Sequence, residues 1–165
     1  MMAIRLCKTA LVAAIALFFT LIAYGNVADY GSNWQFVQHV LVMDTIFPGS
    51  ALQARAITSP ALQELAYRLI IATEAITALL LWFGTARLAL ALRTAHFAHA
   101  DFARAKGPAA LGLTLGLLLY ITGFITIGGE WFAMWQSKIW NGQQPSFGFI
   151  TMTGLVLVIL LLPEK

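Results

Sequence analysis

Residues 67–84 read YRLIIATEAITALLLWFG, an almost unbroken apolar stretch that contains one carboxylate, Glu74. A helix that crosses the hydrocarbon core of a bilayer needs about 20 mainly apolar residues, within a range of about 17–25. The stretch has this length and composition. It therefore predicts a membrane-spanning helix that carries an ionisable side chain inside the membrane.

Three further stretches, residues 9–24, 109–129 and 147–162, have the same character. The whole sequence is 60% hydrophobic and 10% charged, whereas soluble domains carry about 25% charged residues. We therefore expect an all-α membrane protein, a four-helix transmembrane bundle that forms one domain over residues 1–165. We expect the first stretch to stay in the protein as a helix, the alternative being a cleaved signal peptide.

The basic residues predict the orientation in the membrane, because lysine and arginine are enriched in short cytoplasmic loops. With four spans, one side of the membrane receives Arg5, Lys8, Arg87, Arg93, Arg104, Lys106 and Lys165, and the other side receives Arg55, Arg68 and Lys138. This asymmetry predicts cytoplasmic termini. The longest connection, residues 25–66, then lies outside, and it is periplasmic if the membrane is a bacterial inner membrane.

The outer connections are rich in aromatic residues. Residues 34–43 are bulky and apolar with a few polar positions, which predicts a helix in the membrane interface and a partly helical cap. Residues that we expect to contact a partner or lipid headgroups on this face are Trp34, His39, Asp44, Trp131, Trp135 and Trp140. His39 and Asp44 are too few for a zinc site, which needs three or four protein ligands.

Two segments of these connections resemble signatures of a known family. They are residues 36–45, in which FVQHVL is followed by MDT, and residues 135–143, which read WQSKIWNGQ. The chain resembles the small bacterial integral membrane proteins of the family called domain of unknown function 2165. The resemblance covers most of the chain, and it implies a bacterial inner-membrane protein with four spans without implying an activity.

Glu74 is the residue most informative about chemistry. A charged group at the bilayer centre costs about 2.5–3.5 kcal/mol, so Glu74 must face protein or be protonated. Tyr120 lies at a similar depth in its own span, and Thr73 and Thr77 are close in sequence. These four residues form a predicted intramembrane polar site for a proton, an ion or a quinone headgroup. The alternative is that they only fix the packing of the helices.

Three glycines, Gly112, Gly116 and Gly123, predict a stripe of small residues along which another helix packs closely. The sequence contains a single cysteine, Cys7, and its histidines, His39, His96 and His99, all lie outside the predicted spans. We therefore expect no haem, no metal and no other cofactor. The net charge of +3 is explained by membrane topology, so we expect no nucleic-acid partner.

The sequence contains no catalytic motif, and we expect that the protein is not an enzyme. The function that the sequence favours is a non-catalytic accessory or assembly subunit of a larger inner-membrane complex, for example a respiratory one. The expected partners are the lipid bilayer and either such a complex or further copies of the chain. The alternatives are a small proton-coupled transporter or channel that uses Glu74, or a membrane protein that binds a quinone or a lipid.

Overall fold

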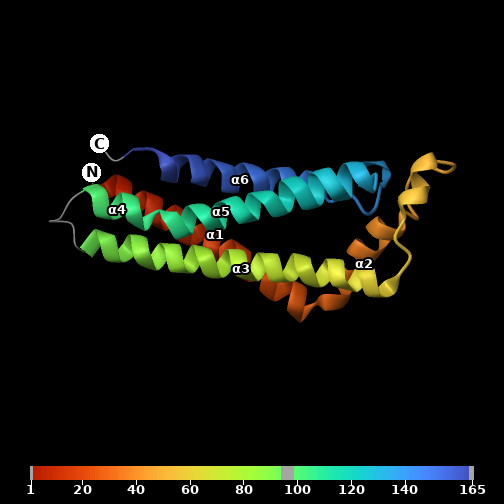
Figure 1. Cartoon of the computed structure of the whole chain (residues 1–165), viewed down its shortest axis with the longest axis horizontal. Helices are drawn as coiled ribbons and strands as arrows, with labels where there is room; N and C mark the ends of the chain where they lie inside the picture. Colours follow the sequence, from red (N-terminus) through yellow and green to blue (C-terminus); the bar gives the residue numbers. More distant parts are fainter. Residues whose placement is uncertain (1, 94–98, 164–165) are drawn as a thin grey trace.

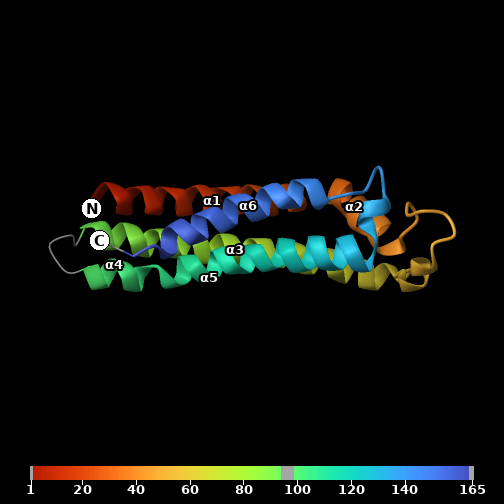
Figure 2. The same cartoon turned by 90° about the horizontal axis from the view of Figure 1, so that it is seen from above.

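The computed structural model describes residues 2–93 and 99–163 of the chain, so His96 and Lys165 lie outside the described residues. Four long helical segments form the body, which is elongated in Figures 1 and 2. They are α1 (Met2–Ala28), α3 (Pro60–Arg93), α5 (Gly107–Leu118) with its continuation η2 (Leu119–Trp131), and α6 (Gln143–Leu161). A short helix, α4 (His99–Ala105), precedes α5.

All four segments are long and apolar enough to cross a membrane, which confirms the predicted four-helix membrane fold. All four helices begin before the predicted spans and three also end later, with the largest extensions at α1 and α3. Pro60 is the first residue of α3, a position that suits proline because no helical hydrogen bond needs its missing N–H. The extensions matter because they place additional polar residues of α1 and α3 on helices.

The segment η2 is wound as a π-helix, which is wider than an α-helix and is rare at this length. In this winding the Phe132 amide donates a hydrogen bond to the Ile127 carbonyl oxygen, five residues back, at 3.0 Å. The winding also rotates later residues away from the direction that an α-helix would give them. Because Gly123 lies in this segment, it does not continue the line that the sequence predicts through Gly112 and Gly116.

One end of the body carries both chain termini (Figure 1). There the ammonium groups of Lys8 and Lys106 donate to the carbonyl oxygen of Leu162 at 2.7 and 3.0 Å. Both lysine side chains are buried. These residues, which the sequence suggests only as markers of orientation, also hold the end of α6 against α1 and α5. We call this the terminal end.

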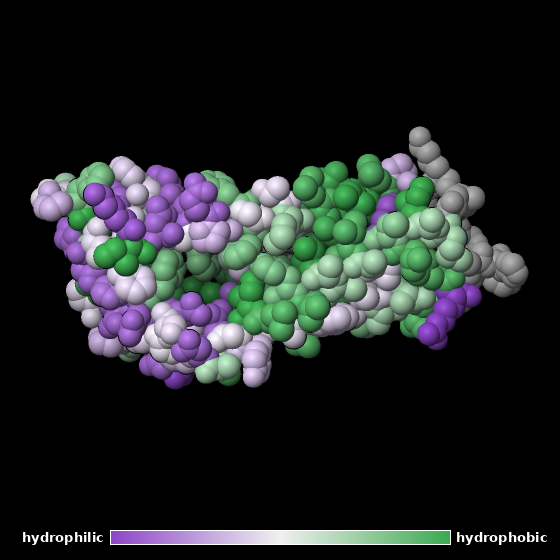
Figure 3. Space-filling model, turned by 180° about the vertical axis from the view of Figure 1, so that it is seen from behind, coloured by the Kyte–Doolittle hydropathy of each residue, from purple (hydrophilic) through white to green (hydrophobic). Residues whose placement is uncertain are grey.

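The opposite end is a polar cap formed by residues 29–59 and 132–142. It contains α2 (Tyr30–Val42) and two short 3-10 helices, η1 (Ala51–Arg55) and η3 (Met134–Gln136). The helix predicted over residues 34–43 corresponds to α2 and begins a turn earlier. Figure 3 shows this polar end next to an apolar body.

The apolar body has the thickness of a bilayer core. Arg68 and Arg87 are 19 residues apart on α3, which at 1.5 Å per residue corresponds to about 28 Å. The hydrocarbon core of a bilayer is about 30 Å thick. Glu74 lies six residues from Arg68, which is about 9 Å along the helix axis from the cap side of this apolar body.

Small residues bring the helices together between this level and the terminal end. A Cβ atom at Gly84 would lie 2.6 Å from the backbone nitrogen of Ala109, so α3 and α5 touch there through their backbones. A Cβ atom at Gly112 or Gly116 would instead meet side chains, those of Leu81 at 2.9 Å and Phe19 at 2.5 Å. By contrast, a Cβ atom at Gly123 would meet only Leu119 of its own helix, at 3.7 Å. The predicted stripe therefore forms a close helix contact at Gly112 and Gly116, whereas Gly123 takes no part in that contact.

Candidate functional site

A cavity of about 400 Å³ lies where the body meets the cap. Its walls come from α1, α2, α3, η2 and α6. The rings of Phe18 and Phe149 still join α1 to α6 at a centroid distance of 5.0 Å. Nearer the cap, α1 passes to the far side of α3 from α6 in the view of Figure 1. The surface in Figure 3 is hollowed between the polar end and the apolar body.

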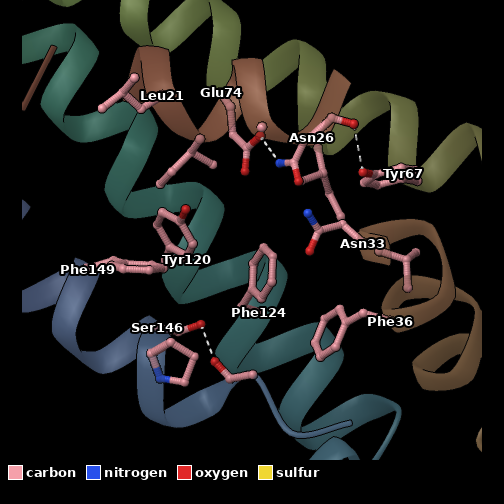
Figure 4. A pocket seen from close by; sticks show the side chains of 16 residues that line it. Leu21, Asn26, Asn33, Phe36, Tyr67, Glu74, Tyr120, Phe124, Ser146 and Phe149 are labelled. Atoms are coloured by element: carbon pink, nitrogen blue, oxygen red, sulfur yellow. Dashed lines mark hydrogen bonds between the residues drawn. The ribbon is translucent and has the colours of Figure 1, made fainter. Parts of the chain in front are cut away.

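A buried carboxylate lies in the wall of this cavity. Only 2% of Glu74 is exposed, and its Oε2 atom accepts a hydrogen bond from Nδ2 of Asn26 at 2.6 Å. The backbone carbonyl oxygen of Asn26 accepts a hydrogen bond from the Tyr67 hydroxyl at 3.1 Å. Figure 4 shows this arrangement. The end of α1 is therefore fixed to α3 through polar contacts at two depths.

Two further polar side chains face the same space without a protein partner. Tyr120 on η2 is only 3% exposed, and Figure 4 shows its hydroxyl on the side of the cavity that faces Glu74. Asn33 on α2 points into the cavity from the cap. Within residues 2–93 and 99–163, neither side chain has a hydrogen-bond partner. A molecule in the cavity could supply those partners.

Aromatic rings form much of the remaining wall. Tyr120 lies 4.9 Å from Phe149 and 5.2 Å from Phe124 between ring centroids. Phe124 in turn stacks with Phe36 of α2 at 6.4 Å. The cavity thus presents a carboxylate, a phenol and an amide among ring faces. Such a mixture of mostly apolar walls and a few directed polar groups is typical of small-molecule sites.

A second cavity of about 250 Å³ adjoins the first. The two share Phe36, Val37, Ile70 and Phe124 in their walls. Every residue that lines the second cavity is apolar or glycine, and Gly123 is one of them. The glycine that departs from the packing stripe therefore borders an open space.

The structure separates the four residues of the predicted intramembrane site. Glu74 and Tyr120 line the first cavity together. Thr73 does not line it, and its hydroxyl donates to the Leu69 carbonyl oxygen of its own helix at 2.7 Å. Thr77 is fully buried one turn below Glu74, next to Gly116. Residue 73 points in another direction around α3 than residue 74 does. Thr77 lies on the same face as Glu74 but one turn deeper, where Gly116 packs against it.

Sequence reasoning missed Asn26, Asn33, Tyr67 and Ser146, which all line the first cavity. Asn26 was assigned to the outer connection because the apolar stretch ends at Tyr24, whereas α1 continues to Ala28. A usable signal was present, since no proline follows Tyr24 until Pro48. Such a segment can continue a helix past the last apolar residue.

The predicted outer-face residues lie on or beside the cap and pair mostly with one another or with near neighbours. His39 Nδ1 lies 2.7 Å from Asp44 Oδ2, and the His39 ring stacks on Trp140 at 4.6 Å. Trp34 stacks with Tyr30 at 6.5 Å. Trp131 lies 4.6 Å from the Arg55 guanidinium, and Trp135 lies 5.8 Å from Phe47. In the described part of the chain, no three possible metal ligands come together.

Four apolar helices around a buried carboxylate define a small multi-pass membrane protein with a cavity between its helices. The model of the family described as predicted small integral membrane protein, DUF2165, matches residues 4–163. The chain belongs to this family, as the resemblance in its outer segments suggests. No curated protein and no solved structure gave a significant match.

Proposed function

We propose that this protein binds an amphipathic small molecule within the membrane. The observation that carries the proposal is the pair of adjoining cavities, one with polar groups and the other entirely apolar. A polar head would occupy the cavity beside Glu74 and Tyr120. An apolar tail would pass Ile70 and Phe124 into the second cavity. Single-chain lipids and quinones with short tails are ligands of this kind.

The route into the cavities supports a ligand that arrives from the membrane. Leu21 lines the first cavity and is 59% exposed, and Leu69 lines the second and is 57% exposed. Both lie on helices that are long and apolar enough to cross a membrane. A molecule dissolved in the bilayer can therefore reach both cavities sideways, and its head remains near the headgroup level where Glu74 lies.

The orientation follows from the positive charges. In our proposal the terminal end, with Lys8 and Lys106, faces the cytoplasm of a bacterium, and the cap faces the periplasm. The ligand then comes from the outer leaflet of the inner membrane. Proton-coupled transport through Glu74 has less support, because Thr77, Leu81 and Leu113 are fully buried between this level and the terminal end.

A second candidate is the accessory-subunit function, which is favoured by the apolar side chains exposed on the polar cap. Ile139 is 75% exposed, and Trp131 and Trp135 are about half exposed. If a larger complex covers them, Trp135→Ala should reduce the amount of partner that co-purifies in gentle detergent. Ile76→Ala, which removes a half-exposed apolar side chain of α3 outside the cap, should not change it. A particle that contains only this chain, alone or as a homo-oligomer, would contradict that candidate.

The binding proposal is tested by native mass spectrometry of the chain purified from its own membranes in mild detergent. We expect a bound molecule of defined mass. Ile70→Trp should remove it, because Ile70 lies in the wall shared by the two cavities and the larger side chain would fill the space between them. The matched control is Ile76→Trp, because Ile76 is half exposed on the same helix and lines neither cavity. The proposal fails if neither a bound molecule nor saturable binding of dodecanol or a short-chain quinone is found.

A further inference from the structure

We infer that the polar head of the bound molecule is a cation, such as an alkylammonium group, held between Glu74 and the aromatic rings of the first cavity. This inference rests on the proposed binding function and specifies the class of ligand. It is carried by the charge and the chemistry of the cavity wall.

Within the part of the chain that the structure describes, the wall contains an acidic side chain with no basic side chain beside it. Glu74 is the only acidic residue that lines the cavity, and no lysine, arginine or histidine among the described residues lines it. The one hydrogen bond that Glu74 receives comes from the neutral amide of Asn26. A buried carboxylate is stable as an ion only beside a positive charge or several donors. The protein supplies one donor here, so a positive ligand would complete the site.

The buried lysines of the protein do not provide that charge. Lys8 and Lys106 lie at the terminal end, where both donate to the Leu162 carbonyl oxygen. The nearest basic residue along α3, Arg68, is exposed and pairs with Glu64 at 2.7 Å. These three basic groups are therefore engaged elsewhere, and no basic side chain among residues 2–93 and 99–163 lines the cavity with Glu74.

The rings around the carboxylate suit a cation as well. Tyr120, Phe124 and Phe149 lie in a connected group with centroid distances of about 5 Å, and Phe36 extends it across to α2. The faces of aromatic rings are negative, and sets of such faces bind quaternary ammonium groups. An anionic head would meet the carboxylate and the same ring faces, both of which repel it. A cavity of about 400 Å³ has room for an alkylammonium head.

The inference is tested with two ions of the same size and shape and opposite charge, tetraphenylphosphonium and tetraphenylborate, together with neutral dodecanol. Binding is measured by equilibrium dialysis of the full chain in nanodiscs of zwitterionic lipid. Wild type, Glu74→Gln and Glu64→Gln are compared, so that partition of each probe into the lipid cancels. Glu64→Gln is the matched control, because it removes a carboxylate from the same helix outside the cavity.

We expect saturable binding of tetraphenylphosphonium and none of tetraphenylborate. Glu74→Gln should weaken the binding of the cation by about 30-fold or more, because it removes one partner of a buried charge pair. Glu64→Gln should leave it unchanged. If Glu74→Gln does not fold, Phe124→Leu tests the same site. It should weaken binding of the cation about 3-fold or more and leave binding of dodecanol unchanged, because only the ring face is lost.

Three results would overturn the inference. Binding of dodecanol without binding of the cation would exclude a cationic head and leave the proposed binding function in place. Equal binding of the cation by wild type and Glu74→Gln, with Phe124→Leu unchanged as well, would place the cation outside this cavity. Absence of saturable binding for all three probes, together with no co-purified molecule, would contradict both proposals.

Discussion

The two halves of the helical body differ in how closely their helices pack. In the packed half, which runs from Thr77 to the terminal end, glycine and alanine bring α3 and α5 into backbone contact at Gly84 and Ala109. In the hollow half, from Glu74 to the cap, aromatic rings of η2, α2 and α6 line an open cavity. One turn of α3 separates a fully packed level from an open one.

The difference shows what Glu74 does in the fold. A carboxylate used only for helix packing would have its hydrogen bonds satisfied by neighbouring helices. Glu74 instead receives one hydrogen bond, from Asn26, and lines an open cavity with the unpaired hydroxyl of Tyr120. The polar atoms of the hollow half are therefore available to a ligand. Each of the following predictions compares a change in one half with a matched change elsewhere.

The largest effect is expected for Gly84→Ala in the packed half. The new Cβ would lie 2.6–2.7 Å from backbone and side-chain atoms of Ala109, and α5 cannot move without opening the core. We expect the free energy of unfolding in mixed micelles to fall by about 2–3 kcal/mol, the upper part of the range for overpacking. The control is Gly148→Ala on α6, where nothing lies within 4 Å. A loss of similar size for Gly148→Ala would contradict the close contact.

The next comparison uses two valines on the two sides of the boundary. Val12→Phe in the packed half should lower the free energy of unfolding by about 2 kcal/mol, because Val12 is fully buried and a larger side chain must displace its neighbours. Val37→Phe should lower the free energy of unfolding much less, since Val37 lines both cavities and the ring can enter them. It should also abolish ligand binding. Thermal unfolding and a binding assay on both variants measure these effects, and equal destabilisation would argue against the cavities.

Two asparagines that line the first cavity give a smaller difference. Asn26→Ala removes the hydrogen bond to Glu74 and should lower the free energy of unfolding by about 1–2 kcal/mol, because it leaves a buried carboxylate without its donor. Asn33→Ala should change stability little, since Asn33 is exposed and unpaired among the described residues. Chemical unfolding of both variants tests this. The contact between α1 and α3 would have no energetic role if Asn26→Ala were neutral.

The smallest effect is expected for Thr77→Val. The Thr77 hydroxyl is buried without a hydrogen-bond partner in the described part of the chain, and valine has nearly the same shape. We expect unchanged stability or a gain of up to about 1 kcal/mol, because an unsatisfied polar group is removed. Ligand binding should not change. If Thr77→Val instead weakened binding, the polar site would extend into the packed half, as the sequence alone suggests.

The sequence predicts the four helices well because each carries a long apolar run, and the runs at 67–84 and 109–129 need no tertiary information. It also identifies Glu74, since a lone carboxylate in such a run is conspicuous. It does not predict the cavity, which depends on where α1 ends and how far it diverges from α6. Asn26 illustrates this, because its role depends on the last turn of α1. The displacement of Gly123 likewise follows from the π-helical winding of η2, which has no simple sequence signal.

The most direct test of the central claim compares two positions on one face of α6, Ser146 in the hollow half and Thr153 in the packed half. Both are buried, but only Ser146 lines a cavity. Each residue is replaced by cysteine in a Cys7→Ser background, and the variants are treated with a membrane-permeant maleimide. Met152 is exposed beside Thr153, so Met152→Cys reports whether the reagent reaches that depth. We predict that Ser146→Cys and Met152→Cys are labelled and Thr153→Cys is not, and that a bound ligand protects Ser146→Cys alone. Resistance of Ser146→Cys while Met152→Cys reacts would show that the cap side of the body is closed and would contradict the account.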